Sequence, residues 1–205
     1  MSVESPAYEV VRREGSFELR RYERYLTASV TVRADSHNAA AYKAFGVLAD
    51  YIFGNNVAAG SIPMTAPVST TRTEGARIAM TAPVTSERVR SAELTEAAPL
   101  CTVDCAGEYT VRFTMPSRYT ELADLPQPND PRVRLDMVPA HRAVAEGFGG
   151  RLDDEMVAAS AERLRAWMAE MDLAPGGEPE AAQYDAPWKP GVIRHNEVII
   201  PVAEA

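Results

Sequence analysis

The sequence lacks the long apolar segments that a membrane protein needs. No run of about 18 uncharged apolar residues occurs in the 205-residue chain, so no membrane-spanning helix is predicted. The opening residues MSVESP also lack the basic and then apolar pattern of a secretory signal peptide. We therefore expect no membrane partner and a cytoplasmic location.

Cysteine and histidine are scarce as well. The chain has two cysteines, Cys101 and Cys105, and an extended LCTVDCAG segment would place them roughly 13 Å apart. That separation is too large for one disulfide bond. Structural zinc normally takes four ligands, and no second cysteine pair is present. The C-x-x-C-H motif for covalent haem attachment is also absent. We expect a reduced cysteine pair and no metal site.

Positive charge is limited and dispersed. The 21 Lys and Arg residues are outnumbered by 29 Asp and Glu, and the arginines form no basic block, so nucleic acid is not an expected partner. The motifs G-x-S-x-G and H-E-x-x-H and the phosphate-binding glycine loop are missing. An apolar fraction of 46% nevertheless suffices for one sizeable core. We predict a single domain over residues 1–205.

What the sequence does contain is a strand-and-helix pattern that occurs twice. Alternating residues predict strands in YLTASVTV and HRAVAEGF, and each is followed by a helical pattern and further strands. Asp35 or Ser36 should cap the first helix, which ends near Gly54, and Asp153 or Asp154 should begin the second. Apolar residues at helical spacing are Ala41, Ala44, Phe45, Leu48 and Ile52 in the first helix, and Val157, Ala161, Leu164, Met168 and Met171 in the second.

These two passages predict an α+β fold of duplicated β-α-β-β units, with pseudo-repeats at about residues 20–115 and 132–203. Two such units can bury their apolar faces jointly by placing both helices against one largely antiparallel sheet or distorted β-barrel. We therefore expect pseudo-twofold symmetry and a cleft between the two halves.

Two nearly identical heptads, IPMTAPV at 62–68 and IAMTAPV at 78–84, follow the first predicted helix. Their even spacing places Met64 and Met80 on one face of a predicted hairpin that turns at Gly75. Pro67 and Pro83 cannot donate hydrogen bonds to a strand ladder, so we infer a locally opened edge. The methionines either fill gaps in the core or line a ligand pocket, and the two roles are compatible.

Several longer phrases together resemble the SOUL haem-binding family. They are YEVVRREGSFELRRY, FGVLADYIFGNN, the doubled I-x-M-T-A-P-V, YTVRFTMPSRYTELADLPQPNDPRV, and the terminal PW-x-P with RHNEVIIPV. The resemblance runs from about Tyr8 to Val202. It implies a duplicated β-α-β-β barrel with two flanking helices, similar to effector-binding and gyrase-inhibitor-like folds. It also implies reversible binding of haem or free porphyrin.

The resemblance places the ligand in a shallow apolar groove near the first helix. The groove positions in this chain would be Tyr42, Phe45 and Ala49, which lie next to the face that packs on the sheet. Haem also needs cations for its propionates, and the candidates here are Lys43 and Arg21. The chief alternative is that these side chains serve only helix packing and the solvated surface.

Some family members carry a histidine, suggested as axial ligand, where this chain has Arg21. We expect His37, His141 and His195 to be surface or capping residues. If iron is ligated, Tyr42 or a hairpin methionine is as good a candidate as any histidine. Binding through the apolar face alone would discriminate little between haem and metal-free porphyrin.

Two further function classes stay open beside a tetrapyrrole carrier or buffer. An enzyme could act in the same cleft, either removing iron from haem or hydrolysing a small apolar compound. Glu146, in the middle of the apolar strand HRAVAEGF, is then the candidate acid, because buried acids often mark catalytic sites. The structural alternative is a glutamate that faces water or pairs with an arginine. The groove could instead bind a small effector or a peptide.

Overall fold

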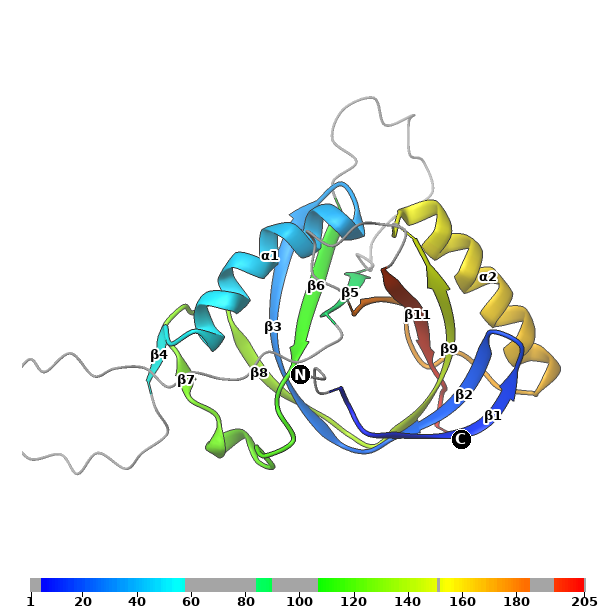
Figure 1. Cartoon of the computed structure of the whole chain (residues 1–205), viewed down its shortest axis with the longest axis horizontal. Helices are drawn as coiled ribbons and strands as arrows, with labels where there is room; N and C mark the ends of the chain where they lie inside the picture. The colour runs from blue at the N-terminus through cyan, green and yellow to red at the C-terminus, as the bar shows by residue number, and fades with distance from the viewer. Residues whose placement is uncertain (1–4, 58–83, 90–106, 151, 185–193, 205) are drawn as a thin grey trace, which may run out of the picture.

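The computed structural model describes residues 5–57, 84–89, 107–150, 152–184 and 194–204. These residues form two α-helices, α1 (His37–Ile52) and α2 (Asp154–Glu170), and a short 3₁₀ helix at Leu122–Asp124 (Figure 1). The strands are β1 (Tyr8–Glu14), β2 (Phe17–Tyr22), β3 (Tyr25–Ala34), β4 (Asn56–Val57), β5 (Val84–Val89), β6 (Gly107–Thr114), β7 (Gln127–Pro128), β8 (Arg134–Val138), β9 (His141–Gly149), β10 (Glu180–Gln183) and β11 (His195–Pro201).

Nine of these strands form one antiparallel sheet in the order β1-β2-β9-β11-β10-β5-β6-β3-β8, and β4 pairs separately with β7. The sheet has two edges, β1 and β8, so it is open and not a closed barrel. It curves strongly, with both helices on its outer side (Figure 1). The predicted α+β class is confirmed, and the antiparallel arrangement takes the form of a distorted sheet.

The strand order contains the predicted duplication. Counted outwards from the centre, β5, β6 and β3 on one side correspond to β10, β11 and β9 on the other. In the second passage β9, α2, β10 and β11 follow one another in the chain, and in the first β3, α1, β5 and β6 do so with the short β4 between α1 and β5. The strand that precedes each passage pairs with the opposite half, β2 with β9 and β8 with β3. These exchanged strands interlock the two halves.

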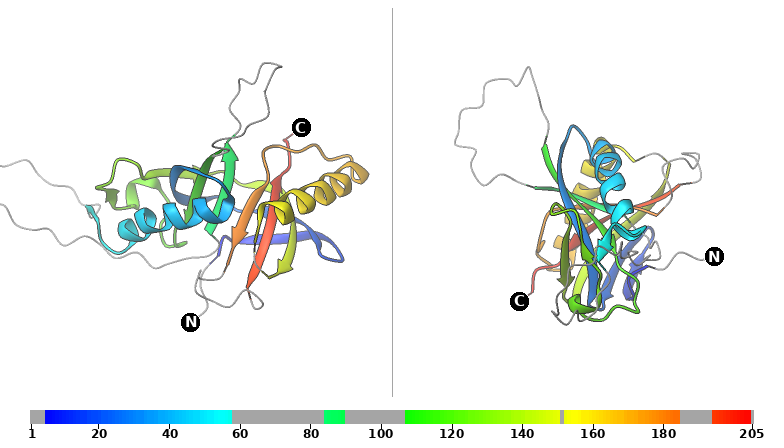
Figure 2. Two further views of the ribbon diagram at one scale, coloured as in Figure 1. Left: turned by 90° about the horizontal axis from the view of Figure 1, so that it is seen from above. Right: turned by 90° about the vertical axis from the view of Figure 1, so that its left-hand side faces the viewer.

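Both helices cover the same face of the sheet, α1 over β3, β5 and β6, and α2 over β9 and β11 (Figure 2). The Ser36 side chain accepts a hydrogen bond from the Ala39 N–H, and Asp153 does the same for Met156, so both predicted caps are confirmed. Leu48 lies buried in the apolar cluster beneath α1, and further apolar residues form a second cluster beneath α2. Within the described part of the chain, neither helix is long and apolar enough to cross a bilayer.

The other face of the sheet is concave and carries polar and aromatic side chains where the two halves meet. Side chains alternate between the faces along each strand. Thr27 of β3, Arg112 of β6 and Glu180 of β10 therefore lie on the face away from the helices, next to core residues such as Val111 and Ala181. A small cluster around Tyr22 and other apolar residues covers the α2 half of this face.

Part of the predicted site lies outside the described residues. Only Val84, with which β5 begins, is described among the residues of the two heptads. Outside the described residues lie Met64, Pro67, Met80 and Pro83 of the heptads and the two cysteines, Cys101 and Cys105. The opened edge and the shared methionine face therefore stay predictions.

Candidate functional site

The predicted groove residues lie on α1 in one row, but they differ in exposure. Tyr42 is 58% exposed, whereas Ala49 is buried. Phe45 is half-buried, and its ring meets the Phe113 ring edge-on with 5.7 Å between the ring centroids. Tyr42 is thus open to a ligand, while Phe45 belongs both to the core and to the surface.

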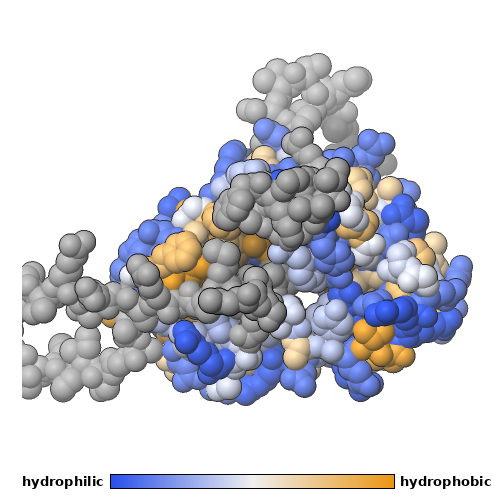
Figure 3. Space-filling view, in the orientation of Figure 1, coloured by the Kyte–Doolittle hydropathy of each residue, from blue (hydrophilic) through white to orange (hydrophobic). Residues whose placement is uncertain are grey.

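Phe53 extends this row and was missed in the sequence. It follows α1 directly, and the spacing i, i+3, i+7 and i+11 places Tyr42, Phe45, Ala49 and Phe53 on one helical face. Phe53 is 56% exposed. We call these four residues the α1 stripe, and Figure 3 shows apolar surface on this half of the molecule. The sequence feature that marks Phe53 is an aromatic residue immediately before Gly54, at the end of the helical pattern.

The two predicted cations do not lie together. Lys43 is on α1 beside Tyr42, and its Nζ donates a hydrogen bond of 2.9 Å to the Arg33 carbonyl oxygen of β3. Arg21 is on β2, in the opposite half of the sheet (Figure 1), where its Nη1 lies 3.2 Å from Glu9 Oε2 of β1. Only Lys43 therefore adjoins the α1 stripe.

His37 is buried, so the expectation of a surface position is wrong for it. It begins α1, and its ring Nδ1 lies 3.3 Å from Asp154 Oδ1 in the first turn of α2. The Asp154 carboxylate also accepts a hydrogen bond from the His37 main-chain N–H, and the Tyr109 ring packs edge-on against the imidazole. His37 therefore joins the starts of the two helices and points away from the α1 stripe.

The other two histidines lie on the concave face. His141 is stacked on the Tyr22 ring with 5.2 Å between the ring centroids, and its Nδ1 lies 2.9 Å from the Pro139 carbonyl oxygen. His195 is exposed, and its Nε2 lies 3.3 Å from Glu197 Oε1. None of the three histidines is placed to ligate iron at the α1 stripe.

Glu146 is buried on β9 and faces α2. Its Oε2 accepts a hydrogen bond of 2.5 Å from Ser160 Oγ, and both carboxylate oxygens accept hydrogen bonds from Arg163. This is the arginine-paired arrangement that we considered as the structural alternative. The described contacts assign the carboxylate to holding α2 against the sheet.

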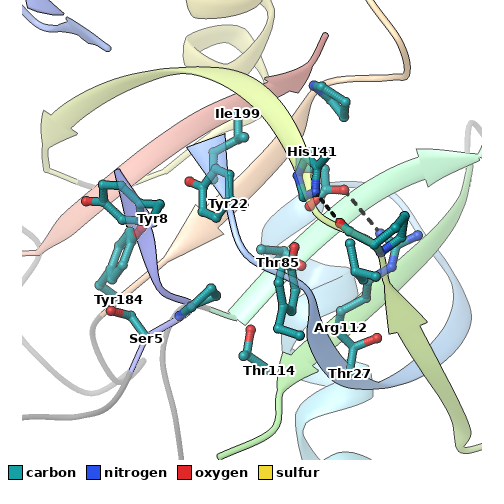
Figure 4. Close-up of a pocket in the computed structure, with 16 residues that line it drawn as sticks. Ser5, Tyr8, Tyr22, Thr27, Thr85, Arg112, Thr114, His141, Tyr184 and Ile199 are labelled. Atoms are coloured by element: carbon teal, nitrogen blue, oxygen red, sulfur yellow. Dashed lines mark hydrogen bonds and ion pairs between the residues drawn. The ribbon is translucent and has the colours of Figure 1, made fainter. Parts of the chain in front are cut away.

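A cavity of about 250 Å³ lies on the concave face between the two halves, where the sequence predicted a cleft, but no predicted site residue is among its described lining residues (Figure 4). Four tyrosines from four different segments line it, Tyr8, Tyr22, Tyr25 and Tyr184. Burial raises the pKa of Tyr22 to about 12, so this hydroxyl stays protonated at neutral pH. The cavity therefore presents uncharged phenol groups and aromatic faces.

Comparison with known proteins supports the fold and indicates the family. The family described as SOUL heme-binding protein matches residues 3–201. The chain is similar in structure to the C-terminal domain of EcmrR, with a TM-score of 0.58, 12% sequence identity, and coverage of 97% of this chain and 99% of that one. A hydrolase from Listeria innocua gives a TM-score of 0.54 at 10% identity, with 94% of each chain covered. At such identities the similarity is one of fold. No curated protein matches the chain.

Proposed function

Because the chain belongs to the SOUL heme-binding protein family, we propose that it binds haem or a related tetrapyrrole reversibly along the α1 stripe. The observation that carries this proposal is the exposure of two aromatic side chains, Tyr42 and Phe53, on the same helical face. Isolated apolar side chains on a surface are ordinary. Here the two exposed rings lie about 16 Å apart along the helix axis, with the half-buried Phe45 between them, and a flat ligand could span them.

The affinity would come chiefly from removing apolar surface from water, at about 25 cal/mol per Å². A tetrapyrrole that lies along α1 would cover the exposed rings of Tyr42 and Phe53 and reach the half-buried edge of Phe45. Ala49 is buried, so the contact would fall on the rings of the other three residues.

Lys43 is the candidate partner for a propionate group. Its present hydrogen bond goes to an uncharged carbonyl oxygen, that of Arg33. A carboxylate is a stronger acceptor for an ammonium group than a carbonyl is, so a propionate could replace this contact. Arg21 lies in the other half of the sheet and is not needed for this arrangement.

None of the three histidines lies at the α1 stripe, so the proposed binding of the tetrapyrrole ring does not depend on its iron. Tyr42 is the described residue of the stripe that could act as an axial ligand. Met64 and Met80 remain candidates for the ligand site, as the sequence suggested, although they lie outside the described residues.

The test is a titration of the full chain with haem and, separately, with iron-free protoporphyrin, followed by porphyrin absorption. We expect saturable binding of both, with dissociation constants within about tenfold of each other, or about 1.4 kcal/mol. Binding of haem without binding of protoporphyrin would contradict the proposal. Release of iron or formation of a product with time would favour the enzymatic alternative, for which Glu146 was the candidate acid.

A further inference from the structure

The cavity on the concave face is separate from the α1 stripe, because the sheet lies between them. Its lining comes from both halves of the fold, with Thr27 of β3 and Arg112 of β6 on one side and Glu180 of β10 on the other. Figure 4 shows Thr27, Arg112, Tyr22 and His141 around the same space. Nothing in the proposed tetrapyrrole binding uses this cavity.

Two buried polar atoms at this cavity make no hydrogen bond within the described residues. They are the Thr27 hydroxyl Oγ1 and the Arg112 Nη1. Thr27 is only 2% exposed, and an unbonded buried polar group is costly. The register places Thr27 opposite Thr114 and Ser29 opposite Arg112, so Thr27 and Arg112 are diagonal neighbours on one face. Both atoms can donate a hydrogen bond, and a ligand oxygen could accept from them.

The charges around the cavity argue against a charged ligand. Arg112 Nη2 donates to Glu87 at 2.9 Å, and Arg112 Nη1 lies 3.6 Å from Glu180 Oε1. An anionic ligand would therefore approach two carboxylates, and a cationic ligand would lie beside the guanidinium. Burial raises the pKa of Glu180, and the charge of Arg112 opposes part of this effect.

The remaining walls are aromatic and apolar. Tyr22, Tyr25 and Tyr184 contribute rings, and Val138 and Ile199 contribute aliphatic surface. The volume of about 250 Å³ is slightly below the usual range of small-molecule pockets. Such a space suits one or two fused rings and is too small for a tetrapyrrole.

We propose that this cavity is a second ligand site, which takes a small uncharged aromatic molecule whose carbonyl oxygen accepts hydrogen bonds from Thr27 and Arg112. The rings pack between the tyrosines, and the oxygen points toward β3 and β6. The site is independent of the tetrapyrrole site in position and in chemistry.

Coumarin is a suitable probe because it is planar, uncharged and carries a carbonyl oxygen. Naphthalene has the same two-ring shape without an acceptor, and N-methylquinolinium adds a positive charge. Binding of each to the isotope-labelled full chain is followed by chemical-shift titration. We expect coumarin to bind more tightly than both of the others and to shift signals from β3 and β6.

Thr27→Val removes the hydroxyl while it keeps the side-chain shape, and it leaves no partner unbonded, so the fold should be retained. We expect it to weaken coumarin binding about three- to tenfold, as loss of one hydrogen bond implies, and to leave naphthalene binding unchanged. The matched control is Thr31→Val, on the same strand but exposed, which should change neither.

Several results would overturn this assignment. They are an unchanged coumarin affinity in a folded Thr27→Val variant, tighter binding of N-methylquinolinium than of coumarin, or the absence of saturable binding by any probe. Displacement of coumarin by protoporphyrin would also contradict it, because the two sites lie on opposite faces of the sheet.

Discussion

Arg20 on β2 and Glu197 on β11 form a buried ion pair that reaches across the intervening strand β9. Arg20 Nη1 donates to Glu197 Oε2 and Nη2 to Oε1, each at 2.7 Å. On this face β9 carries only the small residues Ala143, Ala145 and Gly147 between them, which leaves room for the two long side chains. Burial alone would raise the pKa of Glu197, but its hydrogen bonds with Arg20 and the charge of Arg20 lower it overall.

Arg20→Met should therefore destabilise the fold strongly. It leaves Glu197 as a buried charge without its cationic partner, so we expect the free energy of unfolding to fall by about 3–5 kcal/mol. Urea denaturation at neutral pH measures this. The double variant Arg20→Met/Glu197→Met should lose much less. The control Arg21→Met, on the same strand but in an exposed pair with Glu9, should cost about 0–1 kcal/mol. Equal costs for the two single variants would contradict this account.

Acid should destabilise the protein through His37. Burial lowers the pKa of His37, although the charge of Asp154 opposes part of this effect. The unfolded chain, with an ordinary pKa of about 6.5, takes up the proton first. The stability from the neutral ring is therefore present above that pH and is lost as the pH falls toward the lower folded-state value.

His37→Phe should accordingly lose less stability than the wild-type chain when the pH falls from about 7.5 to about 5.5. Urea midpoints at both pH values provide the measurement. Thr31→Val, which alters an exposed side chain that does not titrate, is the control and should keep the wild-type pH dependence. If His37→Phe also keeps it, the groups responsible for acid sensitivity lie elsewhere.

Much of the fold could be predicted because its elements are set by local chemistry. Ser36 and Asp153 cap their helices through local hydrogen bonds, and the residue pattern in YLTASVTV predicts a strand. The exchange of β2 and β8 between the halves could not be predicted, because strand order depends on contacts far apart in sequence. His37 was misplaced for the same reason, since Asp154, which encloses it, lies 117 residues away.

Replacement of Glu146 distinguishes a structural role of this residue from a catalytic role. Glu146→Gln should lower the free energy of unfolding by about 1–3 kcal/mol, because Arg163 and Ser160 lose a charged acceptor. Haem affinity should not change, since Glu146 faces α2. Arg163→Met, which removes a donor to the same carboxylate, is the companion variant and should act in the same direction. Loss of a time-dependent change in haem, in a Glu146→Gln variant of normal stability, would instead support catalysis.

Lys43 can be tested with a ligand that lacks the propionate charge. Lys43→Met should weaken binding of protoporphyrin about two- to fivefold, the effect of one exposed ion pair. It should leave binding of protoporphyrin dimethyl ester unchanged, because the ester carries no charge. The control is Arg21→Met, which alters the other cation suggested by the sequence. If only Arg21→Met weakened protoporphyrin binding, the propionates would instead bind near β2.

The candidate site was only partly accessible from sequence. Tyr42, Phe45 and Ala49 were identified because helical spacing brings them onto one face. The three side chains differ in exposure. Helical spacing alone could not predict this difference, because it depends on how α1 packs against the sheet. The lining of the cavity on the concave face could not be predicted, because Tyr22, Thr27, Arg112 and Glu180 come from four strands that only the tertiary fold brings together.

Tetrapyrrole binding along the α1 stripe should depend most directly on the exposed ring of Tyr42. The decisive measurement is the dissociation constant of protoporphyrin for Tyr42→Ser compared with wild type, with Val11→Ser on β1 as the matched control, because Val11 is also exposed and apolar. Phe45→Asp should weaken binding further if the variant stays folded. We expect Tyr42→Ser to bind at least about tenfold more weakly, or about 1.4 kcal/mol, and Val11→Ser to bind as the wild type does. Unchanged affinity in a folded Tyr42→Ser variant would contradict the proposed site.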